Sequence, residues 1–487
     1  MSRFNLPALA RRGDTVNLAG GEAFTVDPRY EFATIALTSF AGNQYYRAAD
    51  VTVEHLKILL GQIDPLFAAK VAIYARREAG MRSITHVIAG ELAGEKSRGQ
   101  PWARPFFRQI VRRPDDMLEV IAYITATKGR RPLPNAVRWG FRSALESLDA
   151  HHIAKYQANG KAVSMLDLAN MLHPKPNETN ADALKALIAG TLKQTDTWES
   201  RMSEIGQEEG DKDEARSEAW GDMLARAKAN EQGGIGYFAL LRNLRNIIEQ
   251  APKSIPLACE LLMDADRARK SLVMPFRAAT AYREIAAVTG DGRQPVLAAL
   301  SRAVDALLAN VPRFDGRTLI AVDCSGSMRQ GKMPIKIASV FAAVLYKASD
   351  ADLCLFGADA VWQSPDRATP TLPLAQMIEQ HDGGGTDFKP IFAKAKARYD
   401  RIVLLSDMQG WMEPQYTPSE AYEGYCQRFG GKRPKIYSFD LAGLGTLQFP
   451  QPEVFCLAGF SDKTLDVMAL LEEDRGALVR RIEAVSL

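Results

Sequence analysis

Apolar residues recur at intervals of three and four along most of residues 30–305. Examples are VEHLKILLGQI, PLFAAKVAIYARREA, DDMLEVIAYITATK, NAVRWGFRSALESL and GYFALLRNLRNIIEQ. This spacing places the apolar side chains on one face of a helix, and Gly or Pro closes most of the segments. The pattern predicts many short amphipathic helices. Stacked helix pairs in a repeat solenoid are one arrangement, and a globular bundle is the alternative, since no fixed period is evident.

The pattern changes after Pro312. Short apolar runs typical of strands (RTLIAVD, ADLCLFG, RIVLLSD, KIYSFDL, EVFCLAG) now alternate with helical ones such as MPIKIASVFAAVLYKAS, PIFAKAKARY and SEAYEGYCQRF. Such alternation predicts a mostly parallel sheet with helices on both faces. The fold class expected is therefore multidomain, with an all-α part at residues 1–311 and an α/β part at residues 312–487.

Charge separates these parts further. Residues 96–142 hold 11 Lys and Arg but 3 Asp and Glu, whereas residues 312–487 hold 20 and 22. A basic cluster of this kind suits a polyanionic partner. Residues 199–222, with 9 acids and 3 bases, indicate a solvated connector or helix. No membrane-length apolar run, secretory signal or patterned cysteine set is evident, which favours a cytoplasmic protein without membrane partners.

Candidate chemistry begins at LIAVDCSGSMRQGK, where a buried strand runs into Asp323. Ligands in open parallel sheets collect beyond the carboxyl ends of the strands. Ser325 and Ser327 follow Asp323, Thr386 lies in the loop HDGGGTDF, and Asp407 closes RIVLLSD. Two carboxylates, three hydroxyls and water are hard oxygen donors that suit Mg²⁺, with Mn²⁺ and Ca²⁺ as alternatives. Because few of these ligands are acidic, the bound ion would keep unneutralised positive charge, which is available for an acidic protein ligand.

Two other interpretations of DCSGS are weaker. It could be a turn that only caps a helix, or the nucleophile loop of a haloacid-dehalogenase-type phosphatase. That phosphatase chemistry requires a general acid two residues after the first Asp, where this chain has Ser325. The full set of five residues instead resembles the metal-ion-dependent adhesion site (MIDAS) of von Willebrand factor A domains.

Several further segments resemble the Ro (TROVE-domain) family of RNA-binding proteins, in its bacterial or phage-type form. They are NQYY (43–46), MLHPKP (171–176), ALLRNLRNI (239–247), VMPFRAATAYREI (273–285) and HDGGGTD (381–387). The resemblance implies a HEAT-like helical-repeat ring with a basic hole, closed by a C-terminal von Willebrand factor A domain. It also implies capture of single-stranded 3′ ends of misfolded or structured noncoding RNA, Y RNA on the outer surface, and a role in RNA quality control and ribonucleoprotein assembly. An exoribonuclease is a further partner that the family implies.

The resemblance places Arg138 and Arg142 in the helix that lines the hole, and His173 and Lys175 in a segment associated with Y RNA. Other basic residues expected at the RNA are Arg112, Arg113, Lys128, Arg130 and Arg131. For each of them a solvated helix face is the alternative, and for His173 a locally satisfied side chain.

The remaining family-like segments leave choices open. Tyr45 and Tyr46 suit base stacking or, more simply, core packing. Arg242 and Arg245 suit either a structural role or phosphate contact. No catalytic set and no phosphate-binding loop is present, so we expect a binding protein and not an enzyme. The competing hypothesis is a protein–protein adaptor that uses a metal-dependent A domain on a helical scaffold.

Overall fold

The computed structural model of the 487-residue chain describes most of its length. The described residues are 15–16, 22–23, 25, 27–39, 49–129, 132–193, 198–207, 212–330, 334–408, 418–431, 433–441, 454–458, 463–473 and 476–487. They form two compact units. The helical unit comprises residues 27–196 and 458–487, and the mixed unit comprises residues 1–26 and 197–457.

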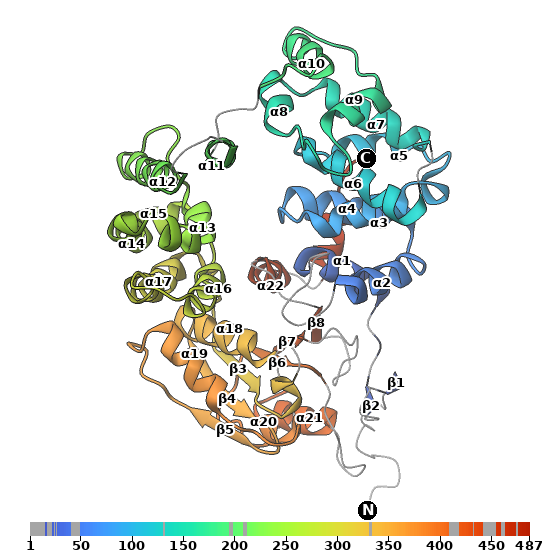
Figure 1. The fold of residues 1–487 in the computed structure, drawn as a ribbon. Helices are drawn as coiled ribbons and strands as arrows, with labels where there is room; N and C mark the ends of the chain where they lie inside the picture. The colour runs from blue at the N-terminus through green and yellow to red at the C-terminus, as the bar shows by residue number, and fades with distance from the viewer. Residues whose placement is uncertain are drawn as a thin grey trace, which may run out of the picture. The chain divides into compact units, whose positions relative to one another are not determined.

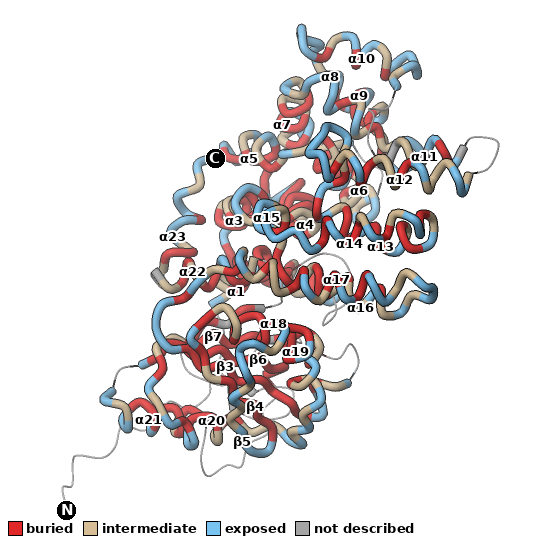
Figure 2. Tube along the Cα trace, turned by 90° about the vertical axis from the view of Figure 1, so that its left-hand side faces the viewer, coloured by how far each residue is buried: buried red, intermediate tan, exposed pale blue. Residues whose placement is uncertain are grey.

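The helical unit is built from short helices packed against near neighbours in sequence (Figure 1). Its first ten helices are α1 (Pro28–Thr38), α2 (Ala49–Leu60), α3 (Pro65–Arg77), α4 (Ser83–Leu92), α5 (Ala103–Gln109), α6 (Pro114–Lys128), α7 (Asn135–Glu146), α8 (Ala150–Lys155), α9 (Met165–Leu172) and α10 (Ala181–Ile188). Helix α3 packs on α4, α4 on α6, and α5 on α7. Buried and exposed residues alternate along most of these helices, as expected for amphipathic helices, whereas α1 is buried throughout Glu31–Thr38 (Figure 2).

Residues 458–487 complete the helical unit from far along the chain. They form α22 (Thr464–Glu473) and α23 (Ala477–Glu483), which pack against α1 and α3. Arg29 pairs with Glu483, and the Lys70 ammonium donates to the Glu483 carbonyl at 2.5 Å. The unit is therefore closed by two widely separated segments.

Local sequence sets the ends of several helices. Asp64 caps α3 by accepting from the Leu66 N–H, with Pro65 at the first helical position. Ser164 and Asp167 form a reciprocal capping box at α9. His173 ends α9 in the left-handed conformation (φ 48°), ahead of Pro174.

The mixed unit begins with seven helices that stack in the same manner. These are α11 (Trp198–Gln207), α12 (Lys212–Ala229), α13 (Tyr237–Gln250), α14 (Ile255–Met263), α15 (Ala265–Lys270), α16 (Pro275–Ala286) and α17 (Arg293–Ala306). Although residues 199–222 are acidic, α12 buries Trp220 and Met223. Two short strands of two residues each, β1 (Thr15–Val16) and β2 (Glu22–Ala23), pair antiparallel in this unit and were not predicted.

The mixed unit ends in a six-stranded sheet with strand order β5-β4-β3-β6-β7-β8. Its strands are β3 (Thr318–Asp323), β4 (Ala351–Phe356), β5 (Ala360–Gln363), β6 (Arg401–Ser406), β7 (Lys435–Asp440) and β8 (Val454–Ala458). β4, β3, β6 and β7 are parallel, and β5 is antiparallel to β4. Helices α18 (Ile335–Ala348) and α19 (Thr371–Gln380) lie on the side of the sheet next to α16 and α17 (Figures 1 and 2). α20 (Lys389–Ala393) and α21 (Pro418–Arg428) lie on the opposite side.

These elements confirm the predicted succession of helices and the α/β sheet that follows it. The helix expected over PIFAKAKARY is shorter than its apolar pattern, because α20 ends at Ala393, where Arg428 donates to three nearby carbonyls. The boundary at residues 311–312 falls between α17 and β3, inside the mixed unit; the division into domains there stays a prediction. In the part of the chain that the structure describes, no helix has the length and apolar character to cross a membrane.

Candidate nucleic-acid interface and metal centre

Asp323 lies at the point where the sheet topology reverses. It is the last residue of β3, whose neighbours are β4 on one side and β6 on the other. The chain continues from β3 to β4 on one side and later returns to β6 on the other, and such a reversal opens a crevice at the carboxyl end of β3, where ligands bind in such sheets. Asp407 comes directly after the adjacent strand β6, and both carboxyl side chains are buried.

The Asp323 carboxylate holds the loop that follows it. Oδ1 accepts the Ser325 N–H at 2.9 Å, and Oδ2 accepts the Ser406 hydroxyl at 2.6 Å. The Ser325 and Ser327 hydroxyl oxygens lie 3.1 Å apart. Because a carboxylate has about four acceptor positions, these two hydrogen bonds leave Asp323 with acceptor capacity for a cation.

The glycine-rich loop at residues 383–385 is attached to the same place by its backbone. Ser325 and Gly384 form a parallel bridge, the Gly326 N–H donates to the Gly384 carbonyl at 3.0 Å, and the Gly383 N–H donates to the Cys324 carbonyl at 2.9 Å. A Cβ atom at Gly383 would stand 3.0 Å from the Cys324 carbonyl carbon, so glycine permits this approach. Thr386, half-buried, follows two residues after the bridge.

The electrostatics of this site suit a cation. Burial raises the pKa of Asp323 to about 7; hydrogen bonds from Ser325 and Ser406 oppose the shift and the charge of Asp407 adds to it. A bound divalent cation would offset both burial and repulsion. Among the described residues no group of three or more His, Cys, Asp or Glu is placed to hold a metal. The donor set here is instead two carboxylates with hydroxyls, a set that fits Mg²⁺.

A second site lies in the helical unit, where α5 and α7 border a groove of about 900 Å³. The side chains that give it its chemistry are Arg77, Arg104, Arg108, Arg112, Trp139 and His152. It has four arginines and a tryptophan but no acidic residue in its lining. Such a surface attracts polyanions.

The close crossing of α5 and α7 forms the floor of this groove. Gly140 lies on α7 where α5 passes, and a Cβ atom there would stand 2.5 Å from the Phe107 Cβ and 2.9 Å from the Arg104 carbonyl oxygen. Phe107 and Phe141 pack edge to face beneath, with ring centroids 5.8 Å apart. The glycine thus allows the two helices to meet closely, with Arg104 and Trp139 on the groove side.

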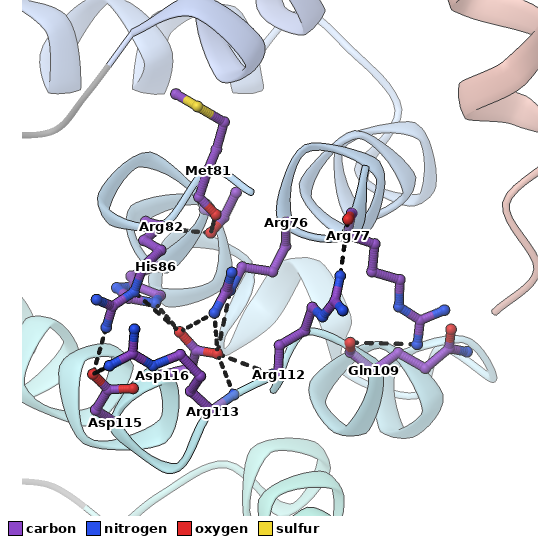
Figure 3. A network of polar contacts seen from close by, with 11 residues as sticks. Arg76, Arg77, Met81, Arg82, His86, Gln109, Arg112, Arg113, Asp115 and Asp116 are labelled. Carbon is purple, nitrogen blue, oxygen red and sulfur yellow. Dashed lines mark hydrogen bonds and ion pairs between the residues drawn. The ribbon is translucent and has the colours of Figure 1, made fainter. Parts of the chain in front are cut away.

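A buried ion-pair network fixes the loop that carries Arg112 (Figure 3). The Asp116 carboxylate accepts from the Arg76 guanidinium at 2.8 Å and contacts His86 Nε2 at 2.8 Å. It also accepts the backbone N–H groups of Arg112 and Arg113, both at 2.9 Å. Burial alone would raise the pKa of Asp116, but His86 and Arg76 together hold it well below the usual carboxyl range. The carboxylate therefore fixes the backbone from which the Arg112 side chain extends.

The predicted RNA residues of α7 have different surroundings. Arg138 is exposed and bonds weakly to Asn135 at 3.4 Å. Arg142 is half-buried, and its Nε donates to Glu146 at 2.9 Å. The Lys175 backbone N–H donates to the same Glu146 carboxylate at 2.8 Å, so α7 and the MLHPKP segment are joined there.

Other predicted residues are committed to local contacts. The Lys128 ammonium donates to the Gly90 and Ala93 carbonyls at the end of α4, and burial lowers its pKa. Arg112 donates to the Arg77 carbonyl, and Arg113 pairs with Asp115. The side chains of His173 and Lys175 are exposed. Arg130, Arg131, Tyr45 and Tyr46 lie outside the described residues.

The structure gives the surroundings of Arg242 and Arg245, the two arginines of α13 whose role the sequence left open. Arg242 is exposed, with its guanidinium carbon 6.0 Å from the centroid of the exposed Phe238 ring. Arg245 is exposed and pairs with Glu249 at 2.7 Å. Both arginine side chains are exposed and lie off the buried face of α13, so a buried structural role fits neither residue.

The sequence interpretation overlooked Trp139, Arg77 and Ser406. Helical spacing could have revealed Trp139, because the buried positions of α7 include Val137, Phe141 and Leu145, and residue 139 lies off that face. Nothing in the sequence marks Ser406 as the partner of Asp323, since that contact depends on the pairing of β3 with β6.

Comparisons with known proteins agree with this architecture. Residues 41–220 match the TROVE domain. The chain is 25% identical to the RNA-binding protein RO60 of Deinococcus radiodurans over 488 aligned positions, which cover 89% of each chain. The crystal structure of the RO (RSR) protein of Deinococcus radiodurans superposes with a TM-score of 0.65 at 20% identity, and the match covers 94% of this chain and 100% of that one.

Fold and sites thus define a protein with stacked helices and a C-terminal α/β domain of the von Willebrand factor A type. With a TROVE domain over residues 41–220 and similarity to an RNA-binding RO60 protein along most of its length, the chain resembles Ro (TROVE-domain) proteins.

Proposed function

We propose that this chain captures single-stranded 3′ ends of misfolded or structured noncoding RNA in a basic ring and binds a Y-like RNA on its outer surface. It would thereby act in RNA quality control and ribonucleoprotein assembly. The observation that carries the proposal is the arginine-lined groove between α5 and α7. The RNA-binding relative from Deinococcus radiodurans supports the same class of ligand.

The groove arginines suit phosphate contact because their charges are not used up by acids. The Arg77 guanidinium reaches the Gln109 carbonyl at 3.5 Å, and Arg112 donates to the Arg77 carbonyl at 2.8 Å. Both bonds go to neutral acceptors, which leave the guanidinium charge available for phosphate. Arg104 and Arg108 line the same groove without an acidic neighbour in its lining.

A gel shift with a structured RNA that bears a single-stranded 3′ tail tests this function. Affinity should fall steeply between about 50 and 200 mM salt, because each neutralised phosphate releases counterions. The same RNA without its tail is the matched control and should bind more weakly. Absence of binding at about 50 mM salt, or binding indifferent to salt, would favour the protein–protein adaptor.

We further propose that Asp323, Ser325, Ser327, Thr386 and Asp407 hold Mg²⁺, directly or through water. The raised pKa of Asp323 and its remaining acceptor capacity support the assignment. When bound, the ion would supply a Lewis-acidic point for a carboxylate of an acidic protein partner. Ser327 is exposed and Thr386 half-buried, so the site is open on their side to such a partner.

The remaining parts of the proposal concern the cellular compartment and an enzyme partner. Cys259, Cys324 and Cys354 are free and buried, which supports a reducing compartment such as the cytoplasm. An RNA held by its single-stranded end is a substrate that an exoribonuclease could degrade, and we include such an enzyme among the partners. Pull-down of the tagged protein with and without ribonuclease treatment distinguishes a direct enzyme contact from one bridged by RNA.

A further inference from the structure

Trp139 is a large aromatic side chain that the fold leaves in the open. Its exposed fraction is 46%, whereas Phe107 and Phe141 beneath it are fully buried. The residue lies in the lining of the groove between α5 and α7. An exposed tryptophan within a concave basic surface is a feature that core packing alone does not explain, because nearly half of its surface stays outside the core.

Two guanidinium groups flank this ring from different helices. The Arg104 guanidinium carbon of α5 lies 5.7 Å from the Trp139 ring centroid, and that of Arg142 on α7 lies 5.5 Å away. Both distances lie within the roughly 6 Å at which a guanidinium is attracted to an aromatic ring. Trp139 nevertheless stays 46% exposed, so ring surface remains for a flat ligand between these two cations.

We propose that Trp139 is the stacking platform for one unpaired nucleobase of the bound RNA, with the adjoining phosphates held by Arg104 and Arg108. The inference rests on the proposed RNA-binding function and states which feature of the RNA this groove recognises. Base–aromatic stacking tolerates any base, because every base has a π-face, while arginines beside it follow the backbone. The groove thereby recognises single-strandedness and not a particular sequence.

The same geometry disfavours duplex RNA. A base in a duplex has both faces covered by its neighbours in the stack, so its face can meet Trp139 only after it is unstacked and unpaired. Unstacking costs a few kcal/mol, and the grooves of A-form RNA present base edges at most, never a base face. Single-stranded tails avoid this cost. Phosphate contact alone would leave duplex and single strand far less distinct.

The alternative is that Trp139 only holds the side chains of Arg104 and Arg142 in position. In that case removal of Trp139 would change the positions of Arg104 and Arg142, but no base of the bound RNA would be quenched by stacking on Trp139. A fluorescent base analogue separates the two roles, since a stacked 2-aminopurine is quenched by its aromatic neighbour. The probe is a structured RNA with a 3′ tail of adenosines that contains one 2-aminopurine.

The experiment compares full-length wild type with Trp139→Leu and Trp139→Phe. Trp139→Leu should bind the tail roughly 5- to 150-fold more weakly and abolish the quenching that wild type produces. Trp139→Phe should restore part of both, because it keeps an aromatic face. Leu272→Ala, at a position that is 80% exposed in the other unit, is the control and should behave as wild type. Circular dichroism and thermal unfolding confirm that each variant is folded.

Two outcomes would overturn the inference while the proposed function stands. One is wild-type affinity and quenching in folded Trp139→Leu. The other is salt-dependent binding by wild type with no quenching at any tail position, a result that needs no variant. By contrast, wild type that fails to bind tailed RNA at all would overturn the proposed function itself.

Discussion

Gly140 of α7 lies against Phe107 of α5 so closely that a Cβ atom at Gly140 would stand 2.5 Å from the Phe107 Cβ. We expect Gly140→Ala to lower the free energy of unfolding by about 1–3 kcal/mol, because α5 and α7 must move apart. The same movement should weaken RNA binding in the groove above. Thermal unfolding and a gel shift measure the two effects.

Gly206 of α11 is the matched control for this substitution. It is also a helical glycine, but a Cβ atom there would meet nothing within 4 Å. Gly206→Ala should therefore be neutral or stabilising by up to about 1 kcal/mol, since alanine favours the helix. Equal destabilisation by both variants would contradict the close crossing of α5 and α7.

Asp116→Asn should lower the free energy of unfolding of the helical unit. The change leaves Arg76, which is 5% exposed, without its buried counter-charge, at a cost of roughly 3–5 kcal/mol. Asp115→Asn is the neighbouring control; Asp115 pairs with Arg82 and Arg113 in a more exposed position, so its loss should cost about 1 kcal/mol or less. Urea unfolding at pH 7 should place the two midpoints well apart.

The acid side of the stability profile depends on the same carboxylate. Hydrogen bonds and charge from His86 and Arg76 outweigh burial and hold the pKa of Asp116 far below its unfolded value near 3.9. Its stabilising contribution is therefore present above pH 4 and is lost as the pH falls through the folded pKa. Wild type should lose stability below about pH 4, whereas Asp116→Asn should show a flatter curve there.

Asp323→Asn gives a prediction of opposite sign. Because burial raises the pKa of Asp323 to about 7, the stability of the metal-free protein contributed by this group is present below about pH 4 and is lost as the pH rises through 7. At pH 8 without metal, Asp323→Asn should be roughly 2–4 kcal/mol more stable than wild type, since no charge is buried. An amide can still accept from the Ser325 N–H and donate to the Ser406 hydroxyl oxygen.

Addition of Mg²⁺ should reverse that order. Wild type should gain thermal stability at pH 8 and the variant should not, because the variant lacks the charged ligand. RNA affinity should be the same in both proteins, since the groove and the metal site belong to different units. A Tm shift of equal size in both proteins would remove Asp323 from the metal site.

Arg138→Glu with Arg142→Glu should weaken capture of single-stranded tails far more than it harms folding. Loss of the Arg142–Glu146 pair costs about 0.3–0.5 kcal/mol, and Arg138 is exposed. Arg226→Glu is the matched control, because it breaks an Arg–Asp pair of the same spacing on α12. Filter binding over a salt series should show a smaller slope for the double variant only. Unfolding of the double variant, or wild-type capture of tails, would place this helix elsewhere.

The arrangement of strands and loops around Asp323 was more predictable from sequence than the groove. Asp323, Ser325 and Ser327 are neighbours in the chain, and strand pattern alone predicts that Asp323 and Asp407 end parallel strands. The groove depends on the crossing of α5 with α7, which side-chain volume at Gly140 controls and which no periodicity encodes. Basic residues were therefore predicted as a cluster, but Arg77 and Trp139 were missed and Lys128 proved to be held by carbonyls.

The packing of α22 and α23 was likewise beyond the sequence pattern. An apolar face such as that of LDVMALLEE is compatible with many partners, and its contact with α1 is a property of the whole fold.

That contact also sets the order in which the molecule can be finished. Helices α22 and α23, which pack on α1 and α3, come from residues 458–487 and are synthesised after residues 197–457 of the mixed unit. A truncated product that stops before α22 therefore leaves the helical unit without two of its helices, although residues 27–196 have already been made.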